Sequence, residues 1–195
     1  MSKGLYLAVI LALFFAGADA RAFQIEQMSY YSSRNNGPGL DQMVRVVNPG
    51  EQGSPLSLHH GAVCADIYVF DSEQVMIECC ACPVTANGLL ELSVLHALTG
   101  NPLTGSPGPS QGVITIVSDD YQNCNETSPI AASGLTAWAS HLQTPLSGVL
   151  VVTEGEFISA PLSNQQLGFL GQTCSFVQYL GSGKGICNCG SPGSG

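Results

Sequence analysis

The sequence predicts a mainly β protein, either an antiparallel sandwich or a β-rich barrel, with one or two short helices and stabilised by disulfides. Three observations lead to this class. Short apolar runs alternate with turn residues, glycine and proline are abundant at 23 and 11 residues, and eight cysteines follow a segment typical of an export signal. Each short strand has one apolar face that a second layer must cover, which favours a sandwich or a barrel.

The first 20 residues have the pattern of a signal peptide. Lys3 gives a basic start, residues 5–15 are apolar, and a small-x-small pattern ends at Ala20. The apolar run is shorter than the roughly 20 residues that span a bilayer. We therefore expect cleavage between Ala20 and Arg21, no membrane insertion afterwards, and a secreted protein that is extracellular or lies on the cell surface.

The charge balance narrows the classes of partner. The chain has 5 Lys and Arg against 14 Asp and Glu, a formal net charge of -9. Nucleic acids and anionic lipid surfaces are bound through clustered basic side chains, which this chain lacks. We expect neither as a partner.

The mature chain is expected to begin with a flexible arm at residues 21–39, which is polar and irregular and could add a strand to a neighbouring subunit. A single β-rich domain follows at residues 40–189. Its first strand is expected at residues 42–48 and ends at Pro49, because proline has no amide hydrogen for a ladder.

Residues 62–82 predict a β-hairpin. Apolar side chains alternate along residues 63–70, and a group with turn chemistry at residues 71–73 precedes a second apolar run. Pro83 is expected to end the second strand.

The later elements are less sharply marked. Residues 88–98 and 128–142 fit either a helix or a strand, because short apolar runs do not separate the two. Ser163 and Gln166 form a capping-box pattern that predicts a helix to about residue 170. We also expect a loop at 101–112 and a strand at 113–118. Strands at 148–154 and 156–160 would form a hairpin or flank a bulge at Gly155. The chain would end with strands at 174–180 and 186–189 and a flexible tail at 190–195.

The cysteines are candidates for disulfides rather than for a metal site. Export delivers the chain to an oxidising compartment and the count is even, whereas thiolate metal sites usually use Cys-x-x-Cys spacing. Strand alternation puts Cys80 and Cys82 on one face, opposite Cys79, and gives the C-terminal pair a shared face. We favour bridges between these two groups, although roughly a hundred pairings are open. The candidates are Cys64, Cys79, Cys80, Cys82, Cys124, Cys174, Cys187 and Cys189.

These motifs resemble a group of uncharacterised secreted Cys-rich proteins of soil bacteria. The likeness is carried by Cys-Ala-Asp-Ile-Tyr-Val-Phe-Asp at 64–71, Glu-Cys-Cys-Ala-Cys-Pro-Val-Thr at 78–85, Asn-Gly-Leu at 87–89, residues 177–185 and the terminal Cys-x-Cys. The resemblance implies export and a bacterial origin and no particular chemistry.

We expect no enzyme, no catalytic residue and no cofactor, because the chain has no serine-hydrolase elbow, zinc-protease motif or nucleotide loop. His59 and His60 are weak candidates as metal ligands or acid–base groups. Their rings point apart in an extended chain, which favours an exposed loop. His96 and His141 are expected to be held by local hydrogen bonds. Asp119 and Asp120 are expected in a solvated turn rather than a calcium site.

These observations together predict a secreted structural or surface protein that acts by binding or self-assembly, as a filament or adhesin subunit. Its partner would be itself, another extracellular protein or a glycan. The alternatives are a thiolate metal-binding or redox protein and an extracellular hydrolase that uses His59 or His60.

Overall fold

The computed structural model describes residues 24–33, 40–50, 61–100, 108–144, 148–180 and 187–189. The predicted signal peptide with its Ala20–Arg21 cleavage site, the loop with His59 and His60, and the predicted tail lie outside these residues. The described strands are β1 (Gln24–Ser32), β2 (Met43–Val47), β3 (Val63–Asp71), β4 (Met76–Val84), β5 (Leu89–Ser93), β6 (Gln111–Asp120), β7 (Thr136–Gln143), β8 (Val151–Glu156) and β9 (Ile158–Leu162), and the helices are η1 (Val94–Leu98) and α2 (Asn164–Leu180).

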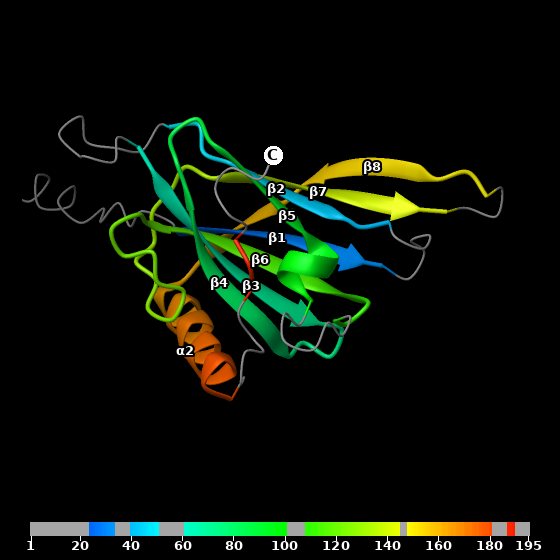
Figure 1. The fold of residues 1–195 in the computed structure, drawn as a ribbon. Coiled ribbons are helices and arrows are strands. Elements are labelled where there is room, and N and C mark those ends of the chain that lie inside the picture. Colours follow the sequence, from blue (N-terminus) through cyan, green and yellow to red (C-terminus); the bar gives the residue numbers. More distant parts are fainter. Residues whose placement is uncertain are drawn as a thin grey trace, which may run out of the picture.

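The strands form two antiparallel sheets, as Figure 1 shows. One has the order β4-β3-β6-β1-β9 and the other the order β5-β2-β7-β8. The predicted mainly β, disulfide-stabilised class is confirmed, in the form of a sandwich rather than a closed barrel.

The main core lies between the sheets and follows from strand alternation. Val63, Ala65, Ile67 and Val69 of β3 point into it and are fully or almost fully buried. Gln27 of β1 crosses the core: its amide nitrogen donates to the carbonyl of Leu135, and its amide oxygen accepts from the Ala137 amide at 2.8 Å. This pairing satisfies a buried polar side chain and ties the two sheets together.

The other face of the five-stranded sheet is buried as well. Tyr68, Cys79 and Val117 pack there against Leu167, Leu170 and Cys174 of α2, which lies across this face in Figure 1. β3 is therefore buried on both faces, and its polar side chains require partners inside the protein.

The expected flexible arm at residues 21–39 requires a correction. Residues 24–32 form β1, which lies between β6 and β9 inside the five-stranded sheet. Both ladders of this strand are occupied, so it has no free edge to donate to a neighbouring subunit.

The predicted hairpin is confirmed as β3 and β4. The carboxylate of Asp71 accepts from the amides of Glu73 and Val75, both at 2.9 Å, and closes the turn. The expected end at Pro83 was wrong, because β4 continues to Val84. β4 is an edge strand, where proline is tolerated because an outward-facing position needs no donor.

The structure resolves both segments that fitted either a helix or a strand. Residues 88–98 divide into β5 and the π-helical turn η1, where the Ser93 hydroxyl accepts from the His96 amide at 2.8 Å. In the second segment β7 begins at Thr136, and the residues before it form a covering loop.

The expected hairpin at residues 148–160 was wrong. β8 pairs with β7, whereas β9 pairs with β1 of the other sheet. Phe157, which is buried in the core between them, marks the point where the chain crosses from one sheet to the other.

The capping box at Ser163 is confirmed. The Gln166 amide donates to the Ser163 hydroxyl at 3.2 Å, and the Gln166 side chain accepts from the Ser163 amide at 3.0 Å. The helix is longer than expected, so the strand predicted at residues 174–180 was wrong. Buried positions at Leu167, Leu170 and Cys174 follow helical spacing past the predicted end.

Candidate functional site

Strand β8 is the open margin of the four-stranded sheet. Within the described residues it pairs with β7 alone. The run Val149, Leu150, Val151 and Val152 is exposed, with 63% of Val149 and 56% of Val152 accessible. In Figure 1 the β7–β8 ribbon extends past the end of β1, away from α2. The structure thus presents unpaired ladder groups beside an uncharged apolar run.

The opposite margin of the sandwich is covered. The Cys187 amide donates to the carbonyl of Cys79 at 3.3 Å, and the Cys189 sulfur lies 3.4 Å from the carbonyl of Ala81. Residues 187–189 therefore lie along the edge of β4, which also contains Pro83. They have no regular secondary structure, so the strand expected at 186–189 is not found in its described part.

The two remaining edges are short. β9 and β5 have five residues each; β9 contains Pro161, and β5 leads directly into η1. Glu91 of β5 also forms an ion pair with Arg45 of β2 at 2.7 Å. Short length, proline and charge all discourage pairing with another chain. β8 has six residues and carries two glutamates, of which Glu154 also pairs with Arg45, but the apolar run at residues 149–152 contains neither proline nor charge.

The eight cysteines form four disulfides. Cys64–Cys124 joins β3 to the loop after β6, and Cys79–Cys174 joins β4 to α2. The other two bridges, Cys80–Cys187 and Cys82–Cys189, hold the C-terminal segment against β4. Each closes a loop of 107 residues, for which the chain-entropy model gives about 4 to 5 kcal/mol.

Four sulfurs converge at this end of the sandwich. The Sγ atoms of Cys80 and Cys82 are 3.6 Å apart, and the Sγ atoms of Cys80, Cys82 and Cys189 all lie within 4.8 Å of one another. Cys80, Cys82 and Cys187 are buried, and Cys189 is half-buried. Strand alternation brings Cys80 and Cys82 to one face, opposite Cys79.

A buried carboxyl pair lies under the loop at residues 121–135, and sequence reasoning missed it. Asp66 of β3 is fully buried, and neither of its side-chain oxygens accepts a hydrogen bond from any described residue. Burial, followed by the charges of Asp119 and Glu126, raises the pKa of Asp66 to about 9. A pKa in this range keeps Asp66 protonated at neutral pH.

Asp119 organises the loop above it, so the expected solvated turn was wrong for this residue. Its carboxylate accepts from the amides of Asp120, Asn125 and Ile130 and from the Asn123 side chain, at 2.6 to 3.0 Å. The carboxylate is fully buried and satisfied by N–H donors. These donors occupy the lone pairs that a hard cation would need.

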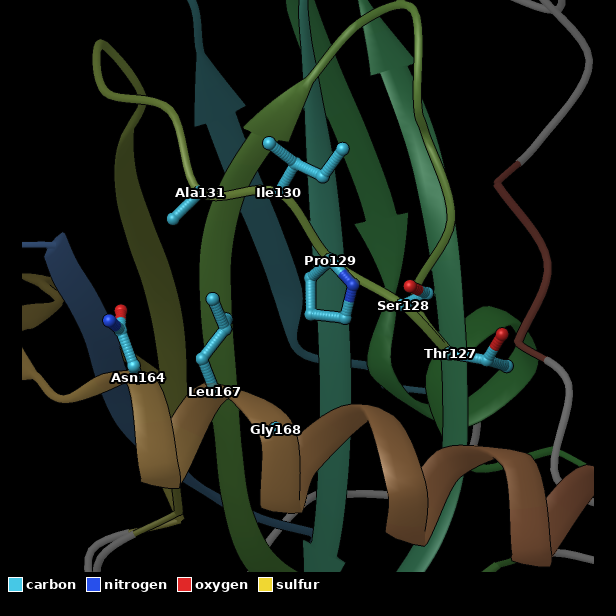
Figure 2. A pocket seen from close by; sticks show the side chains of 8 residues that line it. All are labelled: Thr127, Ser128, Pro129, Ile130, Ala131, Asn164, Leu167 and Gly168. Atoms are coloured by element: carbon cyan, nitrogen blue, oxygen red, sulfur yellow. The ribbon is translucent and has the colours of Figure 1, made fainter.

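The same loop and α2 form a groove of about 450 Å³. Figure 2 shows one wall made by residues 127–131 and the other by Asn164, Leu167 and Gly168. Every lining side chain is uncharged. The groove ends at Gly171, one helical turn further on, where the helix backbone packs against the loop. There is no room for a side chain at this position, because a Cβ on Gly171 would lie only 2.6 Å from the Thr127 carbonyl oxygen.

The described histidines do not form a catalytic arrangement with any described residue. His141 is buried and stacks on Tyr30 with ring centroids 4.3 Å apart, and its Nδ1 has no hydrogen-bond partner among the described residues. The expected local hydrogen bond is therefore not found at Nδ1 of this ring. Burial lowers the pKa of His141 and favours the neutral form.

No helix within the described ranges is both long and apolar enough to cross a membrane.

Comparison with known proteins gives little similarity. No family model and no curated protein matches the chain. A solved structure that the chain is similar to, "Anabaena sensory rhodopsin transducer", has 13% identity and a TM-score of 0.34, over 68% of this chain and 94% of that one. A TM-score this low carries neither fold nor activity to this chain.

Proposed function

We propose that this protein is a secreted structural subunit whose copies associate through β8. The open apolar edge of β8 is the observation that carries the proposal. A folded protein normally blunts the edges of its sheets against pairing with other chains. Here covalent bridges, proline, charge or short length protect the other three edges, while the first half of β8 and the two residues before it form an uncharged apolar run at residues 149–152.

An antiparallel pair of β8 strands would satisfy the edge. Two copies related by a two-fold axis present the same strand to each other, and the two four-stranded sheets join into one. In one such pairing, Val151 of one copy lies opposite Val151 of the other. Glu154 then faces Gly148 of the second copy, so no two glutamates lie opposite each other. Pairing then covers the exposed valines of both chains without opposing like charges.

Four disulfides suit this role in an oxidising extracellular setting. They hold each copy in its folded form, so that association takes place through the surface of folded subunits and not through exchange of strands. The export signal predicted for residues 1–20 supports the same compartment.

Sedimentation velocity of residues 21–195 over a range of concentrations tests the proposal. We expect the wild-type chain to form dimers or larger species. Val151→Lys should weaken association at least tenfold, because it places a charge at the centre of the new ladder. Phe176→Lys is the matched control, since Phe176 lies on α2 and is 62% exposed.

Two results would contradict the proposal. One is a wild-type chain that stays monomeric at every concentration. The other is equal loss of association in the Val151→Lys and Phe176→Lys variants, which would place the interface outside β8.

A further inference from the structure

We propose that Cys80, Cys82, Cys187 and Cys189, once reduced, form a thiolate site for a single thiophilic d¹⁰ metal ion such as Zn²⁺ or Cu⁺. The disulfides occupy these sulfurs in the oxidised protein and therefore mask the site. This inference is independent of association through β8.

The sulfur positions match the geometry of a thiolate site. A thiophilic ion binds sulfur at about 2.3 Å, so two sulfurs on one ion lie roughly 3.8 to 4.0 Å apart in tetrahedral or trigonal coordination. The Sγ atoms of Cys80 and Cys82, which belong to different bridges, are 3.6 Å apart, and that of Cys189 is bonded to Cys82 and lies within 4.8 Å of Cys80. Once the bridges are reduced, Cys82 and Cys189 separate by side-chain rotation, and three sulfurs can share one ion.

The fourth sulfur is supplied by Cys187, which is bonded to Cys80 in the oxidised state. Three thiolates suit Cu⁺, and all four suit tetrahedral Zn²⁺. Neither Cys64–Cys124 nor Cys79–Cys174 belongs to such a group among the described residues.

The backbone keeps the sulfurs together after the bridges are reduced. Residues 187–189 are bound to the sheet and to η1 by hydrogen bonds from Cys187 to the Cys79 carbonyl at 3.3 Å and from Asn188 to the Ala97 carbonyl at 2.9 Å. A reduced Cys189 thiol lies within reach of the Ala81 carbonyl. The C-terminal ligands therefore have non-covalent anchors beside β4.

The chemistry balances with a phosphine as the reductant. For each bridge, one phosphine becomes a phosphine oxide, and one water supplies the oxygen and the two thiol protons. Metal binding then releases the thiol protons, four for Zn²⁺ and three for Cu⁺. Oxidation of the thiols by molecular oxygen, which takes up the four electrons and four protons of two bridges and becomes water, would restore the bridges and release the metal.

Titration with Cd²⁺ under anaerobic conditions tests the site, because Cd²⁺ gives thiolate charge-transfer absorption in the ultraviolet. Residues 21–195 are reduced with a phosphine, desalted and titrated, and bound cadmium is measured by elemental analysis. We expect one tight equivalent per chain. The Cys80→Ser/Cys82→Ser variant should bind at least tenfold more weakly.

The Cys64→Ser/Cys124→Ser variant is the control, because it also removes two thiols and should keep the tight equivalent. The absence of tight binding by the wild-type chain would overturn the proposal. Equal binding by the two variants would overturn it too, because a reduced chain that had unfolded would bind cadmium through any of its thiols.

Discussion

At the scale of single residues, Asp66 shows how burial changes the chemistry of a side chain. On the surface it would be an ordinary carboxylate, but under the loop neither of its oxygens has a hydrogen-bond partner among the described residues, and it keeps its proton at neutral pH. Glu78, buried on β4 with Oε2 unpaired among the described residues, behaves similarly, since burial raises its pKa to about 8. Both groups bind a proton more tightly in the folded chain than in the unfolded chain.

Stability should therefore fall as pH rises. Between pH about 4 and about 9 the folded chain holds protons on Asp66 and Glu78 that the unfolded chain has lost, so the free energy of unfolding decreases with pH across this window. Urea unfolding at intervals from pH 4 to 9 measures the slope.

The Asp66→Asn variant identifies the source of that slope. Its side-chain amide stays neutral at every pH in this range, so we expect a flatter pH dependence and a gain on the order of 1 to 3 kcal/mol at pH 9. The exposed residue Asp120 supplies the control, Asp120→Asn. Parallel curves for Asp66→Asn and the wild type would show that Asp66 does not hold the proton.

The scale of elements separates what local sequence can predict from what it cannot. The capping box at Ser163 and the alternation along β3 depend on neighbours within a few residues, and both were predicted. The extent of α2 was not, because Cys174 and Val177 fit a strand until their packing against the sheet is known. Two further features depend on contacts between residues far apart in the chain and could not be predicted locally. One is the sheet that β9 joins, and the other is the loop that buries Asp66.

The helix cap gives a prediction at this scale. Ser163→Ala removes the hydroxyl that accepts from the Gln166 amide and should lower the free energy of unfolding by about 1 kcal/mol. Urea denaturation measures the change. Ser159→Ala, at an exposed position of β9, is the control and should change stability by less than about 0.5 kcal/mol. An equal effect of the two substitutions would mean that the cap does not stabilise α2.

On the scale of the whole molecule, the two margins of the sandwich differ. The margin at β4 is closed by two disulfides and residues 187–189, whereas β8 has no strand on its outer side within the described part of the chain and begins with an apolar run at residues 149–152. Sequence alone suggested that the C-terminal cysteines meet the cluster in residues 79–82. It could not show that this contact protects an edge, because strand order is set by long-range pairing.

Charge should control the association of copies. The formal net charge of -9 makes two copies repel each other, and salt screens that repulsion. We expect the dimer dissociation constant from sedimentation to fall several-fold between about 0.02 M and 0.5 M ionic strength. A rise over this range would indicate that ion pairs, and not an apolar edge, hold the copies together.

Hydrogen–deuterium exchange at low and high protein concentration tests association through β8 most directly. Pairing of the edge would give its outward-facing amides new acceptors, so exchange in residues 149–156 should slow at high concentration. Exchange in β9, at the edge of the other sheet, should stay unchanged. Equal exchange of residues 149–156 at both concentrations, in a sample that sedimentation shows to be associated, would contradict the account.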